Sequence, residues 1–143
     1  MSSFTSASWE KTDLPADDGR PIYAIRGAVG RGFIFWIGYE GSTLSVRIPE
    51  GFLTDGPSIP SFIRWAIPKS ARERAMKAAA VHDLLCEDPR FDRLTADAIF
   101  LTAMKAEGTP AFWREVFFRA ARTNGSKARR NPDEVIFNSN LDG

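Results

Sequence analysis

The chain changes from strand-forming to helix-forming sequence across a segment rich in proline and glycine, and this change constrains the fold more than any other feature. Residues 49–68 contain Pro49, Pro57, Pro60, Pro68, Gly51 and Gly56. Proline lacks a backbone N–H and restricts φ, so neither a long helix nor a long strand can cross this segment. We therefore expect a sheet before it, helices after it, and one short helix within it at 61–66.

Residues 21–48 carry the alternation of apolar and polar side chains that is typical of half-buried strands. Strands are predicted at 21–26, 32–39 and 43–48, with glycine-containing turns between them. They would form an antiparallel meander of three or four strands. Residues 1–20 are polar and are predicted to be a poorly structured lead-in with one short strand near Phe4.

Three helices are predicted after the proline-rich segment, each with a cap or a stop signal. They cover 70–87 with Ser70 as N-cap, 95–107 ended by Gly108, and 109–123 with Thr109 as N-cap, Pro110 at the first helical position and Asn124-Gly125 as the stop. Residues 126–143 are predicted to be an extended tail with a short strand at 135–137. The expected fold is α+β: an N-terminal antiparallel β-meander packed on a C-terminal bundle of three main helices, in a single domain over 21–125.

Length and composition limit the classes of function. The 143 residues suffice for one domain with a core, and the net charge of +1 indicates no general attraction to nucleic acid or to an anionic membrane. The single cysteine, Cys86, excludes an internal disulfide and a multi-cysteine zinc site. No segment approaches the roughly 20 apolar residues that span a bilayer, and the N-terminus lacks the pattern of a signal peptide. We expect the protein in the cytoplasm or in a particle assembled there.

The only histidine, His82, lies on the predicted inward face of the first long helix. That face is otherwise apolar and comprises, at i, i+3 and i+4 spacing, Ala71, Ala75, Ala78, Ala79, Leu85 and Cys86. On the second helix, Asp97 lies in the same row as Phe100, Leu101 and Met104. A titratable group on an inward face must find a partner or it destabilises the fold.

His82 and Asp97 are predicted to be partners. A loop of about seven residues joins the two helices, which favours antiparallel packing. His82 lies near the end of the first helix and Asp97 near the start of the second. In an antiparallel pair their positions along the helix axes therefore differ by only a few ångströms. A direct hydrogen bond between the two side chains is therefore predicted.

Two interpretations of this pair remain open. In a small hydrolase both residues would be catalytic: Asp97 would orient the imidazole, and the other ring nitrogen of His82 would take a proton or bind a metal. Asp83, the next residue, would then add a carboxylate ligand for calcium or magnesium. In the alternative interpretation the pair is only a structural link between two helices.

The proline loop carries further polar side chains to the junction of sheet and helices. Thr54, Asp55 and Ser58 would either be presented to the His82 pocket, with Asp55 as a second metal ligand, or cap the backbone of their own turns. No residue is assigned to an organic cofactor, so a divalent cation is the one cofactor considered.

Eleven phenylalanines and four tryptophans are many for this length, and they would fill a thick core or form a contact surface. Four further groups of side chains are interpreted without a functional role. Cys86 is predicted to be a small core residue, and Glu87, Asp88 and Asp92 are predicted to form a solvated loop. The core face of the third helix is predicted to comprise Phe112, Trp113, Phe117 and Phe118, and a solvated basic patch is predicted at Arg129 and Arg130.

Several of these residues fall into blocks that resemble the uncharacterised phage and prophage family known as domain of unknown function 1353. The blocks are Pro49, Gly51, Phe52, Thr54 and Asp55; Ser58 and Pro60; Ala79, His82 and Asp83; and Arg93, Ala96, Asp97 and Phe100. The resemblance covers about residues 30–125. The chain departs from the pattern at Gly56-Pro57, where a small aliphatic pair is usual, and at Leu84 and Cys86, where a tyrosine is common. The resemblance implies a phage or prophage origin, with the host cytoplasm or the virion as location, and it implies no established activity.

The His82-Asp83 pair followed by Asp97 on a second helix is also similar to phospholipase A-two, although less closely. That similarity implies His82 as the base that activates water, Asp83 as a calcium ligand and Asp97 as the residue that orients His82. The flanking cysteines and the glycine-rich calcium loop of that family are missing here.

Two hypotheses follow, and they differ in what surrounds His82. A hydrolase requires a histidine that solvent can reach in a pocket. A non-enzymatic virion component or assembly protein would have a sealed His–Asp link, and its aromatic residues or tails would contact other phage proteins or further copies of itself.

Overall fold

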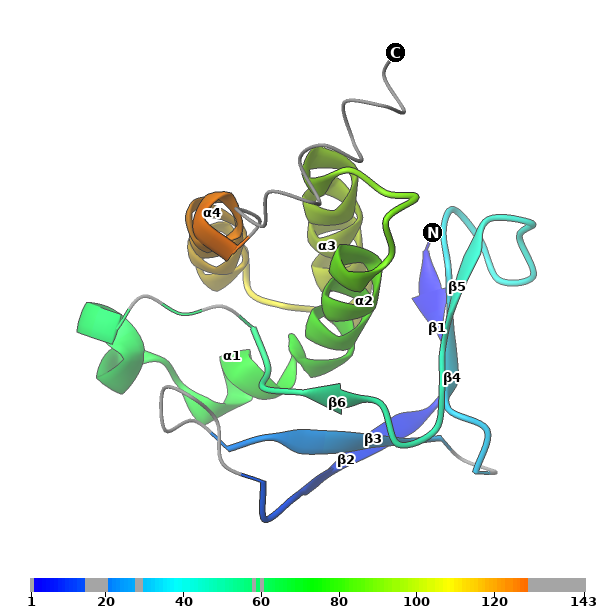
Figure 1. The fold of residues 1–143 in the computed structure, drawn as a ribbon, viewed down its shortest axis with the longest axis horizontal. Helices are drawn as coiled ribbons and strands as arrows, with labels where there is room; N and C mark the ends of the chain where they lie inside the picture. Colours follow the sequence, from blue (N-terminus) through cyan, green and yellow to red (C-terminus); the bar gives the residue numbers. More distant parts are fainter. Residues whose placement is uncertain (1, 15–20, 28–29, 58, 60, 129–143) are drawn as a thin grey trace.

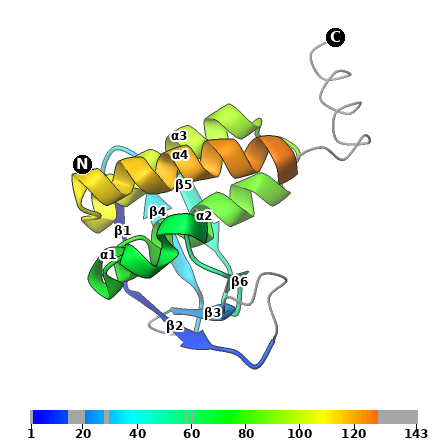
Figure 2. The same cartoon turned by 90° about the vertical axis from the view of Figure 1, so that its left-hand side faces the viewer.

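The computed structural model describes residues 2–14, 21–27, 30–57, 59 and 61–128. In chain order its elements are β1 (Ser3–Phe4), β2 (Ala7–Lys11), β3 (Tyr23–Gly27), β4 (Phe33–Trp36), β5 (Ser45–Ile48), β6 (Leu53–Thr54), the 3-10 helix η1 (Ser61–Ala66), α1 (Lys69–Glu73), α2 (Met76–Glu87), α3 (Arg93–Glu107) and α4 (Ala111–Ala128). In Figure 1, α2 and α3 lie between α4 and the strands β1, β4 and β5. Figure 2 shows the three long helices together on one side of the molecule. The predicted α+β fold, with antiparallel strands followed by three main helices, is confirmed.

The six strands form one meander of three bent segments. β1 and β2 make the first segment, β3 and β4 the second, and β5 and β6 the third. Each segment contributes one strand to each of two antiparallel sheets, ordered β1-β4-β5 and β2-β3-β6. The predicted meander is therefore present, but a bend within every segment divides it into two sheets that lie along two sides of the helices (Figure 1).

The first segment confirms the predicted short strand near Phe4 as β1, and β2 corrects the prediction of a poorly structured lead-in at residues 7–11. Residues 7–11 pair along their whole length with β3, and residues 3–4 pair with β4. Two aromatic side chains in this otherwise polar stretch account for the difference. Phe4 stacks on Phe35 with 4.6 Å between ring centroids, and Trp9 packs against the core. The division of the chain at residue 20 into a lead-in and a domain remains a prediction.

Two glycines and one carboxylate shape the corner between the sheets. Gly32 adopts a φ of +70°, and a Cβ built on it would lie 1.9 Å from the carbonyl oxygen of Ile48. A Cβ on Gly27 would lie 1.8 Å from the carbonyl oxygen of Gly32. The Glu50 carboxylate accepts hydrogen bonds from the N–H groups of Gly27 and Gly32 at 2.8 and 2.9 Å. The backbone segments approach so closely here that only glycine fits.

The first long helix is interrupted, which the sequence did not predict. The short helix at 61–66 is confirmed as η1, but the predicted helix 70–87 is two helices, α1 and α2, separated at Arg74 and Ala75. Pro68, and not Ser70, occupies the N-cap position of α1. Ala75 has φ −127° and ψ 2°, outside the helical region, so the chain turns between the two helices.

The other helix ends match the prediction in part. Gly108 ends α3 at a φ of +86°, as predicted. The helix begins at Arg93 and not at residue 95, because Asp92 caps it by accepting the Thr95 N–H at 2.7 Å. The third helix, α4, continues through Asn124 and Gly125 to Ala128, so the predicted stop is wrong. Glycine weakens a helix by about 1 kcal/mol relative to alanine but does not forbid it. The predicted strand at 135–137 lies outside the described residues.

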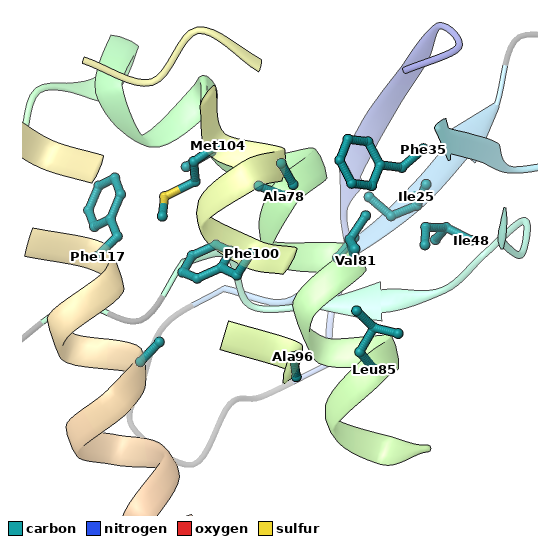
Figure 3. Packing of buried hydrophobic residues seen from close by; sticks show 14 of the residues in the cluster. Ile25, Phe35, Ile48, Ala78, Val81, Leu85, Ala96, Phe100, Met104 and Phe117 are labelled. Carbon is teal, nitrogen blue, oxygen red and sulfur yellow. The ribbon is translucent and has the colours of Figure 1, made fainter. Parts of the chain in front are cut away.

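The core lies between the bent sheets and the helices. Figure 3 shows Ile25, Ile48 and Phe35 of the strands beside Val81 of α2, while Phe100 and Met104 of α3 lie toward Phe117 of α4. The predicted core face of α4 is correct for Phe117, which is buried, and wrong for Phe112, which is 69% exposed. Phe112 lies in the first turn of α4, where its ring meets Trp113 edge-on rather than the core. No helix among the described residues is both long enough and apolar enough to cross a bilayer.

Candidate functional site

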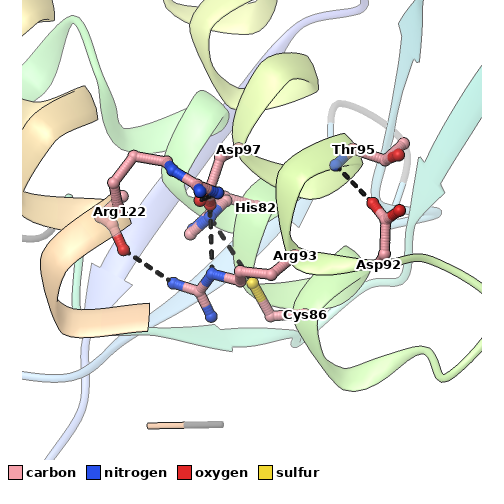
Figure 4. A network of polar contacts seen from close by, with 8 residues as sticks. His82, Cys86, Asp92, Arg93, Thr95, Asp97 and Arg122 are labelled. Carbon is pink, nitrogen blue, oxygen red and sulfur yellow. Dashed lines mark hydrogen bonds and ion pairs between the residues drawn. The ribbon is translucent and has the colours of Figure 1, made fainter. Parts of the chain in front are cut away.

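The predicted contact between His82 and Asp97 is present. Three buried alanines, Ala78, Ala79 and Ala80, precede His82 on α2, and their small side chains let α3 approach closely. His82 Nε2 lies 2.5 Å from Asp97 Oδ1 (Figure 4). His82 is 5% exposed and Asp97 is fully buried. Each polar side chain on these inward helix faces therefore has the other as a partner, as a buried polar group requires.

Two arginines complete the cluster. The Arg93 Nε donates to Asp97 Oδ1 at 3.2 Å, and the Arg122 Nη1 donates to Asp97 Oδ2 at 2.9 Å. Arg93 also donates from Nη2 to the carbonyl oxygen of Ala121. Asp97 thus contacts one side chain from each of α2, α3 and α4, and we call His82, Arg93, Asp97 and Arg122 the buried ionic cluster (Figure 4).

Neither arginine was assigned to the site from the sequence, although Arg93 stands in the block of residues that carries the family resemblance. Arg93 precedes Asp97 by four residues on the same helix, so the i, i+4 rule was a signal that could have found it. Arg122 is separated from Asp97 by 25 residues, and only the packing of α4 on α3 brings it there.

The cluster keeps Asp97 ionised. Desolvation raises the pKa of the Asp97 carboxyl, but the hydrogen bonds from His82 and Arg122 and the electrostatic attraction of His82 and Arg93 outweigh it. The net pKa lies below the ordinary value for an aspartate. A buried carboxylate held by guanidinium groups in this way remains charged at neutral pH.

Two further side chains enclose the imidazole. The Phe100 ring lies over it with 4.7 Å between centroids, and Cys86 Sγ lies 3.5 Å from His82 Nε2. Cys86 and Asp97 therefore approach the same nitrogen. A Cys-His-Asp relay needs the thiol and the carboxylate on opposite ring nitrogens, so this geometry does not form one.

The proline loop reaches α2 one residue beyond His82. The Thr54 hydroxyl donates to Asp83 Oδ2 at 2.7 Å and accepts the N–H of Gly56 at 3.1 Å. Thr54 is buried, whereas Asp55 and Asp83 are half-buried. The structure thus brings Thr54 and Asp83 together, and Thr54 also caps its own turn. Ser58 lies outside the described residues.

The two predicted metal ligands lie on different elements, Asp55 on the proline loop after β6 and Asp83 on α2. Among the described residues, no three His, Cys, Asp or Glu side chains are grouped so as to hold a metal ion. Asp83 has a hydroxyl donor at hydrogen-bond distance. Asp55 and Asp83 as metal ligands therefore remain a prediction.

The acidic loop between α2 and α3 has local partners. Asp88 receives hydrogen bonds from the Arg90 side chain and its backbone N–H, which lower the pKa of Asp88 to about 2. Asp92 caps α3, and Glu87 is exposed. These interactions satisfy the loop locally, which agrees with its interpretation as a solvated loop.

Comparison with known proteins gives one match. The family model described as Protein of unknown function (DUF1353) matches residues 36–121, which run from the end of β4 into α4. Searches of curated proteins and of solved structures found no match. The matched part is more than half of the chain and includes Thr54, His82, Asp83, Arg93 and Asp97. The protein therefore belongs to the DUF1353 family, described as Protein of unknown function.

Proposed function

We propose that this chain is a non-enzymatic structural or assembly protein of a phage particle, and that the His82–Asp97 pair is a link that holds its helices together. The observation that carries the proposal is the fully buried Asp97 carboxylate, whose two oxygens accept hydrogen bonds from α2, α3 and α4. Such a cluster fixes the relative positions of three helices.

The surroundings of His82 support a structural role over catalysis. A general base must come within hydrogen-bond reach of the proton that it removes. His82 is 5% exposed, lies against Phe100, and directs Nε2 at Asp97. These are the features of the sealed link expected for a non-enzymatic protein.

The outer surface supports a role in contacts with other proteins. Trp65 on η1 is 85% exposed, Phe112 on α4 is 69% exposed, and Tyr39 between β4 and β5 is 63% exposed. Large aromatic side chains are enriched at protein–protein interfaces. The partners would be other phage proteins or further copies of this chain.

The proposal is tested by following the chain through particle assembly. Deleting the gene from the phage or prophage that carries it should reduce the yield of complete particles, and mass spectrometry of purified particles should separate a virion component from an assembly factor. Full particle yield after deletion, together with absence of the chain from particles, would contradict the proposal.

His82→Asn is expected to lower the free energy of unfolding by about 1–3 kcal/mol, because the buried Asp97 loses a hydrogen-bond partner and Phe100 loses its ring contact. Chemical denaturation measures this change. Particle yield should fall only as far as the loss of folded protein explains. If the variant keeps wild-type stability while phage fitness is lost, the histidine acts chemically and the structural role is wrong.

A small hydrolase is the second candidate, and two contacts favour it. Asp97 approaches Nε2, which would leave Nδ1 of His82 as the base, and the Thr54–Asp83 contact brings the proline loop to the neighbouring residue. His82 and Asp97 would be the catalytic pair, with Asp83 and Asp55 as ligands for a divalent cation. Magnesium suits two carboxylates better than calcium does, because magnesium retains several waters.

This second candidate predicts that millimolar magnesium or calcium raises the Tm of the wild-type protein, since an ion that binds only the folded state stabilises it. Asp83→Asn should abolish the shift. Glu87→Gln, which removes an exposed carboxylate from the same helix, should leave it unchanged. A Tm that does not depend on either ion would remove the metal from this mechanism.

A further inference from the structure

Two segments at opposite ends of α2 carry opposite net charges. Residues 61–74, which include η1 and α1 and which we call the basic segment, contain four basic residues and one acidic residue, so their net charge is +3. Residues 83–92, which include the end of α2 and the loop to α3 and which we call the acidic segment, contain four acidic residues and one basic residue, so their net charge is −3. The net charge of the whole chain, +1, conceals this local separation of charge.

Each segment also has a large apolar side chain on the surface. Trp65 in the basic segment is 85% exposed. Next to the acidic segment, Leu94 in the first turn of α3 is 62% exposed, and Phe91 within the segment is half-buried. Each surface therefore combines apolar area with charges of one sign. Specific protein–protein contacts combine an apolar anchor with complementary charge in this way.

Within one molecule α2 holds the two segments apart. Its 12 residues span about 18 Å. Figures 1 and 2 both show α1 at one end of α2 and the connection to α3 at the other end. The complementary surface that each segment fits is therefore presented by a second molecule.

From this complementarity we propose that copies of this chain associate with one another through these two surfaces. Trp65 and the cations of the basic segment in one copy dock on Leu94 and the carboxylates of the acidic segment in the next copy. The inference rests on the proposed structural role and names the partner in that role as a second copy. Because two different surfaces meet, the contact is either made twice in a closed pair or continued in a ring or filament.

The residues of the basic segment favour a protein over other anionic partners. Three of its four basic residues are arginines, and tryptophan and arginine are enriched at the energetic centres of protein interfaces. Lys69 lies 3.7 Å from Glu73 of the same segment, which leaves fewer cations for the phosphates of a nucleic acid. Ile67 is buried, so among the described side chains of the segment Trp65 is the large apolar one that could enter a membrane, and it offers little area for insertion.

Sedimentation of the purified full-length chain at several concentrations tests the inference. The mean mass should rise above that of the monomer as protein concentration increases. It should fall when NaCl is raised from about 50 mM to about 500 mM, because salt screens the attraction between opposite charges. A wild-type protein that stays monomeric, or association that strengthens with salt, would overturn the inference.

Substitutions at the two apolar anchors have matched controls. Trp65→Ala should raise the Kd of self-association at least about tenfold, whereas Phe112→Ala, at an aromatic residue 69% exposed on α4, should leave it unchanged. Leu94→Lys should raise the Kd similarly, because it removes the apolar anchor and adds a cation opposite the basic segment. Leu44→Lys, at a leucine 63% exposed between β4 and β5, should have no effect.

Mixing the two weakened variants shows whether their surfaces meet each other. Trp65→Ala keeps an intact acidic segment, and Leu94→Lys keeps an intact basic segment. At a concentration near the wild-type Kd each variant alone should be mainly monomeric, and the mixture should form a complex of one copy of each. Circular dichroism shows that both variants are folded. Absence of this complex, or controls that weaken association as much as the variants do, would contradict the proposed contact.

A different partner of the basic segment gives a distinct result. The wild-type protein would be monomeric and would bind single-stranded DNA or phosphatidylglycerol vesicles, and Trp65→Ala would lose that binding. This outcome overturns self-association. It leaves the proposed role in the phage particle intact, because gene deletion and particle yield test that role separately.

Discussion

Asp97→Asn is expected to lower the free energy of unfolding by about 3–5 kcal/mol, which is the usual cost of removing one partner from a buried ionic group. The asparagine side chain is neutral and retains one acceptor oxygen, whereas Asp97 offers two ionised oxygens to three donors. Arg93 and Arg122 remain charged and carry only donors. One of the two asparagine side-chain atoms would be an NH2 group, so a donor would meet a donor at one side of the cluster. Urea denaturation at neutral pH measures the change.

The matched control is Asp92→Asn on the same helix. Asp92 is exposed and acts as the N-cap of α3, a position that asparagine fills equally well. The same change of charge should therefore alter stability by only a few tenths of a kcal/mol there. If Asp97→Asn were as mild as Asp92→Asn, the cluster would not hold the helices together.

The pH dependence of Asp97 has a definite sign. The folded-state pKa of Asp97 lies below the ordinary value, so its contribution to stability is complete above the ordinary carboxyl pKa and is lost as pH falls through the folded-state pKa. The wild-type protein should therefore lose stability in acid by an amount that Asp97→Asn does not lose. Glu107 has the opposite sign, since its pKa is raised to about 7 and its contribution falls as pH rises.

Gly32→Ala is expected to lower the free energy of unfolding by about 2–5 kcal/mol or to prevent folding. A left-handed backbone costs a residue with a Cβ about 1–2 kcal/mol, and overpacking adds about 1–3 kcal/mol. At Gly32 both apply, because φ is +70° and the new Cβ would lie 1.9 Å from the carbonyl oxygen of Ile48. The two sheets would have to separate at their corner, which thermal denaturation would register as a lower Tm.

Gly30→Ala separates these two causes. Gly30 has nearly the same φ, +71°, but no atom lies within 4 Å of a Cβ built on it. Gly30→Ala therefore has the same backbone cost as Gly32→Ala but lacks the steric clash of the new Cβ, so it should lower the free energy of unfolding by only about 1–2 kcal/mol. Equal effects at the two glycines would mean that the backbone at the corner moves apart easily.

The candidate site was predictable where its geometry is local. His82 and Asp97 each interrupt an apolar helix face, and the short loop between the helices places them at similar positions along the two helix axes. Their hydrogen bond was therefore predictable from periodicity and loop length. Arg122 was not predictable, because its contact depends on how α4 crosses α3. The contact of Thr54 with Asp83 depends likewise on the path of the proline loop, of which the composition indicated only that it is irregular.

For the strands too, local features were predictable from the sequence and contacts between distant segments were not. Alternating side chains and glycine turns determined an antiparallel meander after residue 21, and that pattern is present in the structure. The bend that divides the meander comes from contacts between segments: Glu50 binds Gly27 and Gly32, and Gly32 meets Ile48. Side-chain periodicity along one strand carries no information about such contacts between strands.

The sequence by itself determined the change from strands to helices, the two inward-facing polar groups on the helices, and the C-terminal end of α3, because side-chain spacing and a C-terminal glycine act over a few neighbouring residues. Only the tertiary structure decided that the alanine-rich segment is two helices. Its residues 70–87 favour one continuous helix, yet Glu107 and Thr109 bind the backbone on either side of Ala75. Hydrogen bonds from about 30 residues away stabilise a turn that local helix propensity, at most a few tenths of a kcal/mol per residue, is too weak to prevent.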